Sequence, residues 1–378
     1  MKYILAVGIS MMVFGAVQVS TLPQTADPRE QSASAVLFVP GALTVMTRSL
    51  GTELSGERVL QAPHAAYVPT RAAELFGRQP DASSRARTLA DEVQYARPHL
   101  IGLQQVTELR LQSPGDALFG GREPARTPYL DPLPLLLGEL EARGLHYREV
   151  ARVRNTDVEV PLRRGQEPTF DDLRLTDFDI ILARSDVTVS QVRTGNYLAR
   201  REVKLPRMAP VELTRGWVSV AAEVEGQRYR FVSTHLEPAP GEEGLRVQLA
   251  QAEELIGSLR GETLPVVLVG DFNSPANLGL VGAPTYRELL LAGYVDVWTR
   301  RLGGALASGG GLTLGMTAME ERLNLVLVRT PVSPAPRQLG PVLAYGVGAL
   351  HERRRFGPWR TDLSGVVARL RMPVSARN

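Results

Sequence analysis

Four consecutive apolar residues, Val266–Val269, place the strongest limit on the architecture of this chain. A half-buried strand alternates apolar and polar residues, but this run does not alternate, so it predicts a strand covered on both faces. Covering both faces requires a layer of structure on each side of the sheet. The run therefore predicts a layered fold, and Gly270 directly after it marks the end of the strand.

Other apolar runs predict further strands, and apolar residues repeated at helical spacing predict helices. One helix begins near Ser84, a residue type that caps helices, and stops at Pro98. Trp217–Val224 and Tyr229–Thr234 flank Glu225-Gly226 and predict a hairpin. Strands outnumber helices, and helices separate only some of them, which predicts an α/β fold of two mixed sheets packed face to face with helices outside. The remaining predicted strands are 43–47, 99–106, 147–153, 179–183, 323–328 and 366–370, and the remaining predicted helices are 135–143 and 245–259.

Composition excludes several classes of protein. The chain has 378 residues, of which 44% are apolar and 22% charged, so it can form a large core and lies outside the disordered regime. It contains no cysteine, which excludes disulfides and a thiolate nucleophile. The net charge of +3 permits an anionic ligand, but no strongly basic patch of the kind that binds nucleic acid stands out.

The N-terminal residues predict an export signal or a membrane anchor. Lys2 precedes an apolar stretch over residues 4–17, which is short for a membrane span and typical of a secretory signal, although a retained N-terminal anchor is the alternative. No later run is apolar enough and long enough to span a membrane. The protein is therefore expected to be secreted, or to lie in the periplasm or cell envelope. The predicted organisation is a signal or anchor over 1–20, a linker over 21–39, one domain over 40–372 and a tail over 373–378.

The segment after the buried strand carries the strongest chemical signal. Asp271 and Asn273, in the sequence GDFNS, place a carboxylate and an amide two residues apart at the mouth of a sheet. There they can orient a water molecule and hydrogen-bond a phosphoryl oxygen. The structural alternative is an Asp-Asn turn that caps the next segment, which these residue types favour in general.

A second signal lies at the end of the preceding predicted strand. His235, in the sequence STHLE, can donate a hydrogen bond to a phosphoryl oxygen. The alternative is a structural histidine whose partners lie within the core. The two segments occur in order, separated by one predicted helix, and each therefore strengthens the functional interpretation of the other.

Six segments taken in order resemble the endonuclease/exonuclease/phosphatase superfamily, which includes the DNase I-like nucleases, the neutral sphingomyelinases and the inositol polyphosphate phosphatases. The pair GDFN and TH is specific, and the resemblance extends over roughly residues 40–372. The segments are TVMTRSLG (44–51), PHLIGLQQV (98–106), STHLEP (233–238), VVLVGDFNS (266–274), RLNLVLVR (322–329) and TDLSGVVA (361–368). The segments RPHLIGLQ (97–104) and RGWVSV (215–220) also resemble a bacterial exported branch of the superfamily.

The resemblance implies a four-layered α/β sandwich and Mg²⁺- or Mn²⁺-assisted hydrolysis of a phosphoester. His235, Asp271, Asn273 and Asp362 stand where the family has the same residue types, which implies catalytic roles for them. The partners it implies are a phosphorylated small molecule, a phospholipid head group or a nucleic acid.

Four positions depart from the family pattern. Ser49 stands where the family usually has Asn, and Gln105 stands where the metal-binding Glu belongs. Asn324 replaces the Asp that orients a second histidine, and Leu363 replaces that histidine. Because Mg²⁺ is held by carboxylates, Gln105 weakens the metal site and leaves Asp362 as its main charged ligand. Loss of the imidazole is expected to cost about 10²–10⁴-fold in rate.

Other candidate residues have stronger structural interpretations. His351 and the basic run Arg353–Arg355 could contact an anion, but such runs are usually solvated surface. Glu108, three residues after Gln105, could supply the carboxylate that Gln105 lacks, but its side chain is expected to point to the opposite face of the strand. Trp217, near Arg215, is expected to pack in the core at a strand start.

These observations favour a phosphoester hydrolase by descent whose activity is severely impaired or lost. The first alternative is an active Mg²⁺-dependent phosphodiesterase or phosphatase that uses His235, Asp271, Asn273 and Asp362. The second is a non-catalytic relative whose cleft binds a phosphorylated ligand or a partner, and the third is a purely structural role.

Overall fold

The computed structural model divides the chain into residues 1–36 and residues 37–378, and every residue described below belongs to the second unit. For residues 300, 343–350 and 371 the description covers the backbone alone. The predicted signal segment, linker and tail lie outside the described residues. The described ranges are 42–51, 54–78, 81–121, 123–165, 169–204, 210–239, 241–278, 283–300, 322–331, 343–350 and 365–371.

The larger of two mixed sheets, sheet A, has seven strands. They are β1 Leu43–Ser49, β2 Leu100–Gln112, β3 Thr127–Leu130, β4 Tyr147–Arg164, β5 Thr169–Arg184, β14 Leu343–Leu350 and β15 Gly365–Arg371. The spatial order is β14-β15-β1-β2-β5-β4, and β3 pairs with β2 beside this path. The sheet is mixed because β1 runs parallel to β2 and antiparallel to β15.

The second sheet, sheet B, has six strands. They are β6 Thr188–Asn196, β9 Gly216–Val224, β10 Gln227–His235, β11 Val266–Asp271, β12 Val295–Asp296 and β13 Asn324–Arg329. Their order is β12-β13-β11-β10-β9-β6, and β10 and β11 are parallel to each other while the other pairs are antiparallel. The predicted hairpin is confirmed as β9 and β10.

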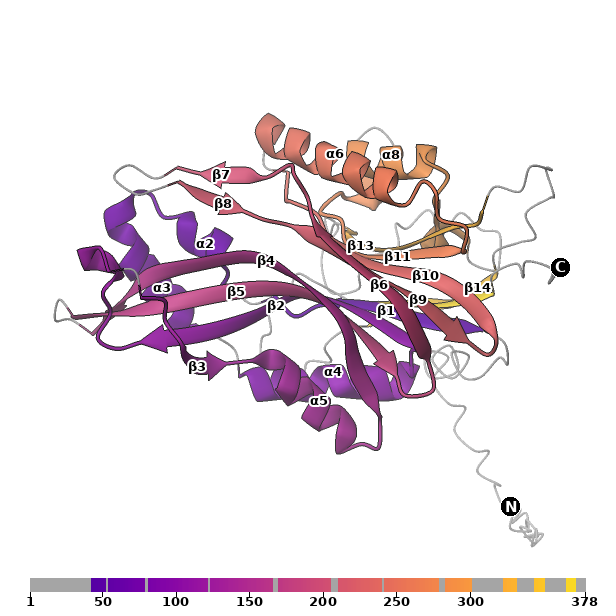
Figure 1. The fold of residues 1–378 in the computed structure, drawn as a ribbon, viewed down its shortest axis with the longest axis horizontal. Coiled ribbons are helices and arrows are strands. Elements are labelled where there is room, and N and C mark those ends of the chain that lie inside the picture. The colour runs from indigo at the N-terminus through magenta and orange to yellow at the C-terminus, as the bar shows by residue number, and fades with distance from the viewer. Residues whose placement is uncertain are drawn as a thin grey trace, which may run out of the picture. The chain divides into compact units, whose positions relative to one another are not determined.

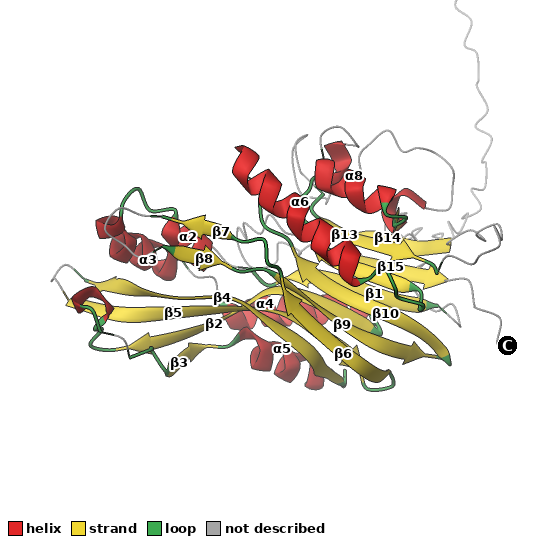
Figure 2. Ribbon diagram, turned by 45° about the horizontal axis from the view of Figure 1, so that its top comes forward, coloured by secondary structure: helices red, strands yellow, loops and turns green. Residues whose placement is uncertain are grey.

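Helices cover the outer faces of both sheets (Figures 1 and 2). α4 (Ala82–Ala96) and α5 (Pro132–Glu141) lie against sheet A, and α6 (Gly241–Ser258) and α8 (Pro284–Leu291) lie against sheet B. None of the helices in the described ranges is both long and apolar enough to span a membrane. The predicted architecture, two mixed sheets face to face with helices outside, is confirmed.

The Val266–Val269 strand shows why the layers form. Val267 and Val269 pack in the core between the two sheets, whereas Val266 and Leu268 pack in the core beneath α6 and α8. All four side chains are buried. The strand is therefore covered on both faces, as its sequence predicts.

A chain of hydrogen bonds joins the two sheets close to one rim. Gln104 Oε1 accepts from Thr47 Oγ1 at 3.0 Å, and Gln104 Nε2 donates to Ser233 Oγ at 2.9 Å. The sheets approach closely here, since a Cβ on Gly102 would lie 2.6 Å from Val269 Cγ2. These contacts fix how the first half of β2 and the end of β10 face each other.

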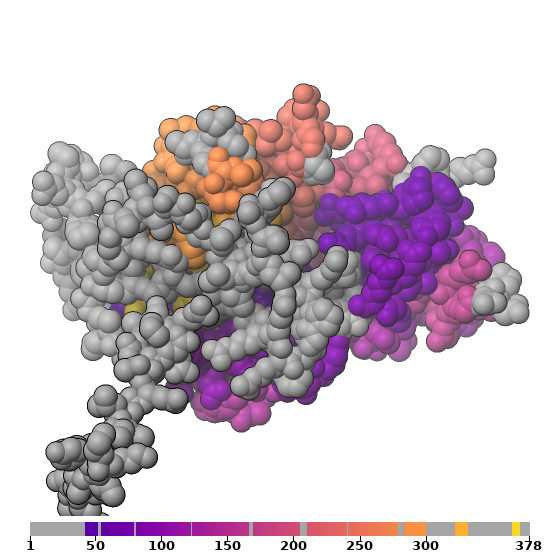
Figure 3. Space-filling model, turned by 180° about the vertical axis from the view of Figure 1, so that it is seen from behind, coloured from indigo at the N-terminus to yellow at the C-terminus, as the bar shows by residue number. Residues whose placement is uncertain are grey.

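An extension beyond the sandwich was not predicted from the sequence. It consists of α2 (Gly56–Leu60) and α3 (Val68–Gly77), which pack on the long ends of β2, β4 and β5, together with the hairpin β7 (Arg201–Val203) and β8 (Val211–Leu213). In Figure 3 the violet surface of α2 and α3 lies beside the pink surface of β7 and β8. The predicted strands cover only 147–153 of β4 and 179–183 of β5, so the parts of both strands that carry the extension were not predicted.

Candidate functional site

Three polar side chains lie next to one another at the rim of sheet B. β10 and β11 are parallel, so their carboxyl ends meet at this rim, and His235 pairs in register with Asp271. On the other side of β11, Asp271 pairs with Asn324 of β13. The register therefore places His235, Asp271 and Asn324 on adjacent strands, although they are far apart in the sequence.

The turn after β11 holds Asp271 and Asn273 in fixed positions. Gly270 has φ of +150°, and a Cβ there would lie 1.9 Å from the backbone oxygen of Thr234, so only glycine fits. The Asn273 N–H donates to Asp271 Oδ1 at 3.0 Å, and Asn273 Nδ2 donates to the Leu236 carbonyl at 2.8 Å. The structural interpretation of this segment, an Asp-Asn turn, thus holds alongside the functional one.

Burial changes the acidity of Asp271. The side chain is 2% exposed, and burial raises its pKa to about 6, although the Asn273 N–H and the positive charge of Arg215 oppose the shift. Asn324 beside it is also buried, and its Oδ1 has no hydrogen-bond partner among the described residues. A carboxylate at position 324, as in the family pattern, would thus lie beside a second buried carboxyl group.

His235 is held as a neutral imidazole. Its Nδ1 lies 3.0 Å from Arg215 Nη1, and because a guanidinium can only donate, Nδ1 accepts and the ring proton is on Nε2. Burial, and then the charge of Arg215, hold the pKa of His235 well below its usual value. The histidine at this rim can therefore offer an Nε2–H group as a hydrogen-bond donor.

Arg215 links the rim to the extension of the fold. It is 6% exposed, and its Nε and Nη2 donate to Glu237 at 3.0 Å and to Glu57 of α2 at 3.2 Å. Arg201 of β7 forms ion pairs with the same two glutamates. From the sequence, this segment was predicted only to start a strand. The role of Arg215 was not predicted, although a charged residue directly before an apolar strand is a signal that could have indicated it.

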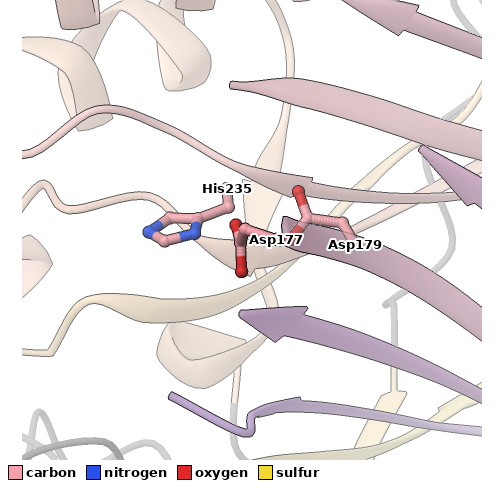
Figure 4. A group of neighbouring side chains, drawn as sticks. All are labelled: Asp177, Asp179 and His235. Carbon is pink, nitrogen blue, oxygen red and sulfur yellow. The ribbon is translucent and has the colours of Figure 1, made fainter. Parts of the chain in front are cut away.

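Two further carboxyl groups, on β5 of sheet A, face His235 (Figure 4). Ligand atoms of Asp177, Asp179 and His235 lie within 4.8 Å of one another, and this group could hold a metal ion. Asp177 accepts from Thr107 Oγ1 at 3.1 Å, and Asp179 accepts from Asn155 Nδ2 at 2.9 Å. This pair was not predicted from the sequence. Its signal there is two acidic residues at alternate positions of a strand, which place both side chains on one face.

The pKa values of both aspartates are raised. Burial is the main cause for each, and the neighbouring charge of Asp177 raises the pKa of Asp179 further. Asn155 and Arg215 act in the opposite direction. The two carboxyl groups therefore do not both ionise readily unless a positive charge joins them.

The polar side chains at the rim of sheet A are neutral and form hydrogen bonds with each other. The Ser49 hydroxyl donates to Gln105 Oε1 at 2.7 Å and accepts from the Gly51 N–H at 3.2 Å. Gln105 has φ of +54° and lies in a bulge of β2. A Mg²⁺ site at this position, as the resemblance implies, does not fit these residues, because they carry no charge and the amide oxygen is already engaged.

The same bulge brings Gln105 into a pocket with residues that the sequence did not indicate. Gln105, Thr107, Asp177, Arg215 and Glu57 all line it. Polar side chains from sheet A, sheet B and α2 thus border one polar pocket at the edge of the rim.

The other candidates are placed as follows. Glu108 pairs with Arg110 and Arg152, and half-buried Trp217 packs against the core beneath α6 and α8. Asp362, Leu363, His351 and Arg353–Arg355 lie outside the described residues. The catalytic and metal-binding roles assigned from the resemblance remain predictions.

Three solved structures are similar to this chain, and the first of them, whose TM-score is above 0.5, supports the fold. An endonuclease/exonuclease/phosphatase from Beutenbergia cavernae is 16% identical over 88% of this chain and 72% of its own, with a TM-score of 0.51. An endonuclease/exonuclease/phosphatase family protein from Leptotrichia buccalis is 13% identical over 88% of this chain and 100% of its own, with a TM-score of 0.48. A mannosyl-6-phosphatase from Bacteroides thetaiotaomicron is 16% identical over 87% of this chain and 100% of its own, with a TM-score of 0.47.

No curated protein matches the sequence. The sequence model of the Endonuclease/Exonuclease/phosphatase family matches residues 74–345, which is more than half of the chain, and this chain therefore belongs to that family.

Proposed function

We propose that this protein binds a phosphoester group at the rim but hydrolyses it with Mg²⁺ very slowly or not at all. The observation that carries the proposal is the hydrogen bond between Ser49 and Gln105. It occupies the amide oxygen at the position where the family pattern has a metal-binding carboxylate. Without that negative charge, Mg²⁺ loses one of the one or two carboxylates that normally hold it.

The sequence adds a second loss on the catalytic side. Leu363 stands where the family has a histidine, and Asn324 stands where the family has its carboxylate partner. A leucine side chain neither transfers a proton nor stabilises phosphoryl charge, so this change alone is expected to lower the rate about 10²–10⁴-fold. Both losses act on hydrolysis, and they leave His235 and Asn273 in place to bind a phosphoryl oxygen.

The groups at the rim of sheet B support binding. His235 offers an Nε2–H donor, and Asn273 is held in place by bonds to Asp271 and Leu236. Asp271, with a pKa of about 6, is mostly ionised at pH 7, and its carboxylate can accept a proton from a water molecule. Residual hydrolysis would therefore depend on Asp271 as the base and on His235 as the donor to the phosphoryl group.

The charges around the pocket bear on the choice of ligand. Glu57 and Asp177 line the pocket with Arg215, so the surface there is not uniformly basic. A nucleic acid strand needs a basic track for its successive phosphates, whereas a small molecule needs to place only one phosphate. We therefore favour a small phosphorylated molecule or a phospholipid head group over a nucleic acid.

Export is part of the proposal, on the basis of Lys2 and the apolar stretch over residues 4–17. Expression of the full chain in a bacterial host, followed by cell fractionation and mass determination of the N-terminus, tests it. Recovery of unprocessed protein only from the cytosol would contradict the proposal.

A metal titration with an activity assay tests the hydrolytic part. We expect millimolar Mg²⁺ to leave the melting temperature nearly unchanged and to give little turnover of bis(p-nitrophenyl) phosphate, because a ligand stabilises a protein only in proportion to its occupancy. Turnover of about 1 per second or more, abolished by Asp271→Ala, would instead establish an active hydrolase. Binding of inorganic phosphate that His235→Ala weakens would support the retained binding site.

A further inference from the structure

The charges at the centre of the molecule do not balance. Arg201 and Arg215 form ion pairs with Glu57 and Glu237, and these two cations and two carboxylates neutralise one another. The charge of Arg215 also acts on Asp177 and Asp179, but Arg215 is already shared by the two glutamates. Within the described part of the chain, the two aspartates face His235 without an ion pair of their own.

One of these aspartates has an oxygen atom with no hydrogen bond. Asp179 is 0% exposed, and Asn155 donates to its Oδ2, while its Oδ1 has no hydrogen-bond partner of ordinary geometry among the described residues. The nearby backbone N–H of Gln105 favours the charged form of this carboxyl group. A buried carboxylate with an unpaired oxygen is costly unless a proton or a cation lies beside it.

The groups around the Asp179 carboxyl group have the arrangement of a cation site. Figure 4 shows the Asp177 and Asp179 carboxyl groups on one side of the His235 ring, with a ring nitrogen turned toward them. One ligand atom from each residue lies within 4.8 Å of the others, so small side-chain movements would bring all three to one ion. From this arrangement we infer that Asp177, Asp179 and His235 bind a divalent transition-metal ion of the Zn²⁺ type.

The choice of ion follows from the donor atoms. Imidazole nitrogen suits Zn²⁺ and its first-row neighbours, whereas Mg²⁺ prefers an all-oxygen octahedron. Three protein ligands of the nitrogen and carboxylate type, with one position left for water, form the usual open zinc site. The proposed ligands are therefore other residues than Ser49 and Gln105, where the family pattern has its Mg²⁺ ligand, although Gln105 lines the same pocket as Asp177.

A metal ion on His235 Nδ1 has to displace one hydrogen bond of Arg215, and the charge of the ion is balanced by Asp177 and Asp179. Its Nη1 donates to His235 Nδ1, and its Nε and Nη2 donate to Glu237 and Glu57. If the ion takes Nδ1, Arg215 loses one hydrogen bond and keeps both ion pairs. Arg215 thus holds the ring in place in the metal-free protein and gives up one contact when the ion arrives.

This inference stands apart from the proposed function, because metal binding is measured without a substrate. The experiment is isothermal titration calorimetry of the metal-stripped full chain with Zn²⁺ and, separately, with Mg²⁺. We expect one Zn²⁺ per chain and at least about 10-fold weaker binding of Mg²⁺. Asp179→Asn should weaken Zn²⁺ binding at least about 10-fold, since loss of even an outer contact to a metal ligand has effects of that size. The control is Asp186→Asn, which removes an exposed carboxylate near the end of the same strand and should leave Zn²⁺ binding unchanged.

Two further measurements keep the test decisive if a variant folds poorly. The visible absorption of the Co²⁺-loaded wild-type protein reports a nitrogen ligand, and His235→Gln should alter that spectrum. Thermal melts should show Asp179→Asn to be more stable than wild type without metal, and Zn²⁺ should stabilise only the wild type. Equal affinity for Zn²⁺ and Mg²⁺, or undiminished Zn²⁺ binding by Asp179→Asn, would overturn the inference. In that case the two aspartates share a proton in place of a metal ion.

Discussion

The two rims that meet at the candidate site differ in how they hold their polar groups. On sheet B, the rim holds Asp271 as a buried carboxyl group, which costs free energy and is constrained by Gly270. On sheet A, Ser49 and Gln105 are neutral, bond to each other and cost little. Groups that are costly to bury persist where function requires them, whereas mutually satisfied neutral groups are typical of a position with no such requirement.

The difference between the rims shows which part of such a site can change without disturbing the fold. A single substitution of Glu by Gln removes the charge but barely changes the shape, so the fold accommodates it. Around Asp271 the turn depends on the residue types themselves, because the Asn273 N–H bonds to the Asp271 side chain. The metal side of such a site can therefore degenerate while the phosphate side keeps its structure.

Restoring the family groups should produce the largest effect. The triple change Gln105→Glu, Asn324→Asp and Leu363→His is expected to raise phosphodiester hydrolysis about 10²–10⁴-fold in the presence of Mg²⁺. Leu363→His alone should do less, because its imidazole would have no carboxylate partner and the metal site would lack charge. Groups that act as a unit are not additive, so the triple variant should exceed the product of the single variants.

Initial rates with bis(p-nitrophenyl) phosphate measure this effect, after circular dichroism has shown that each variant is folded. A triple variant that folds, binds Mg²⁺ and still fails to hydrolyse the substrate would show that the loss is not confined to these positions.

Substitution of two glycines, one on each rim, tests whether the backbone of the sheet B rim tolerates change less than the backbone of the sheet A rim. Gly270→Ala should cost about 3 kcal/mol or more, because the new Cβ would meet the Thr234 backbone oxygen and φ is positive. Gly51→Ala should cost about 1 kcal/mol or less, because its new Cβ would meet the end of the Gln105 side chain, which can rotate away. Urea unfolding measures both, and equal losses would mean that the two rims are equally constrained.

Asp271→Asn should stabilise the protein at neutral pH by about 2–3 kcal/mol. The folded pKa of Asp271, about 6, lies above its ordinary value of 3.8, so the wild-type carboxyl group favours folding below pH 3.8. This contribution is lost as the pH rises through 6. The gap in unfolding free energy between the Asp271→Asn variant and the wild type, measured in urea, should therefore widen from pH 4 to pH 7. A constant gap would count against a raised pKa.

Gln105→Glu should give the smallest change in the free energy of unfolding. It should destabilise the protein, whereas Asp271→Asn should stabilise it. It places a half-buried carboxylate beside Ser49 without a cation, which should cost about 1 kcal/mol in the absence of metal. Millimolar Mg²⁺ should recover part of this loss if the position can again bind the ion. The control is Gln94→Glu, which changes an exposed residue of α4. Mg²⁺ should neither raise nor lower the stability of this variant.

The sequence by itself determined the layers and one rim. The run Val266–Val269 has no polar position, so it had to be covered on both faces, and sheet and helices cover it as predicted. His235 and Asp271 each end a predicted strand, and strand ends at one edge of a parallel pair meet by geometry. Local patterns sufficed here because each depends on residues close together in the chain.

Only the tertiary structure decided the rest of the site. Asp177 and Asp179 lie in a strand whose apolar neighbours fit a core, and no local pattern shows that their face meets His235 across two sheets. Three separate segments contribute Arg215, Glu57 and Glu237. Their charges interact strongly only because burial removes the water from between them. The pKa of a buried group depends on distances to charges remote in the chain, and the folded arrangement alone sets those distances.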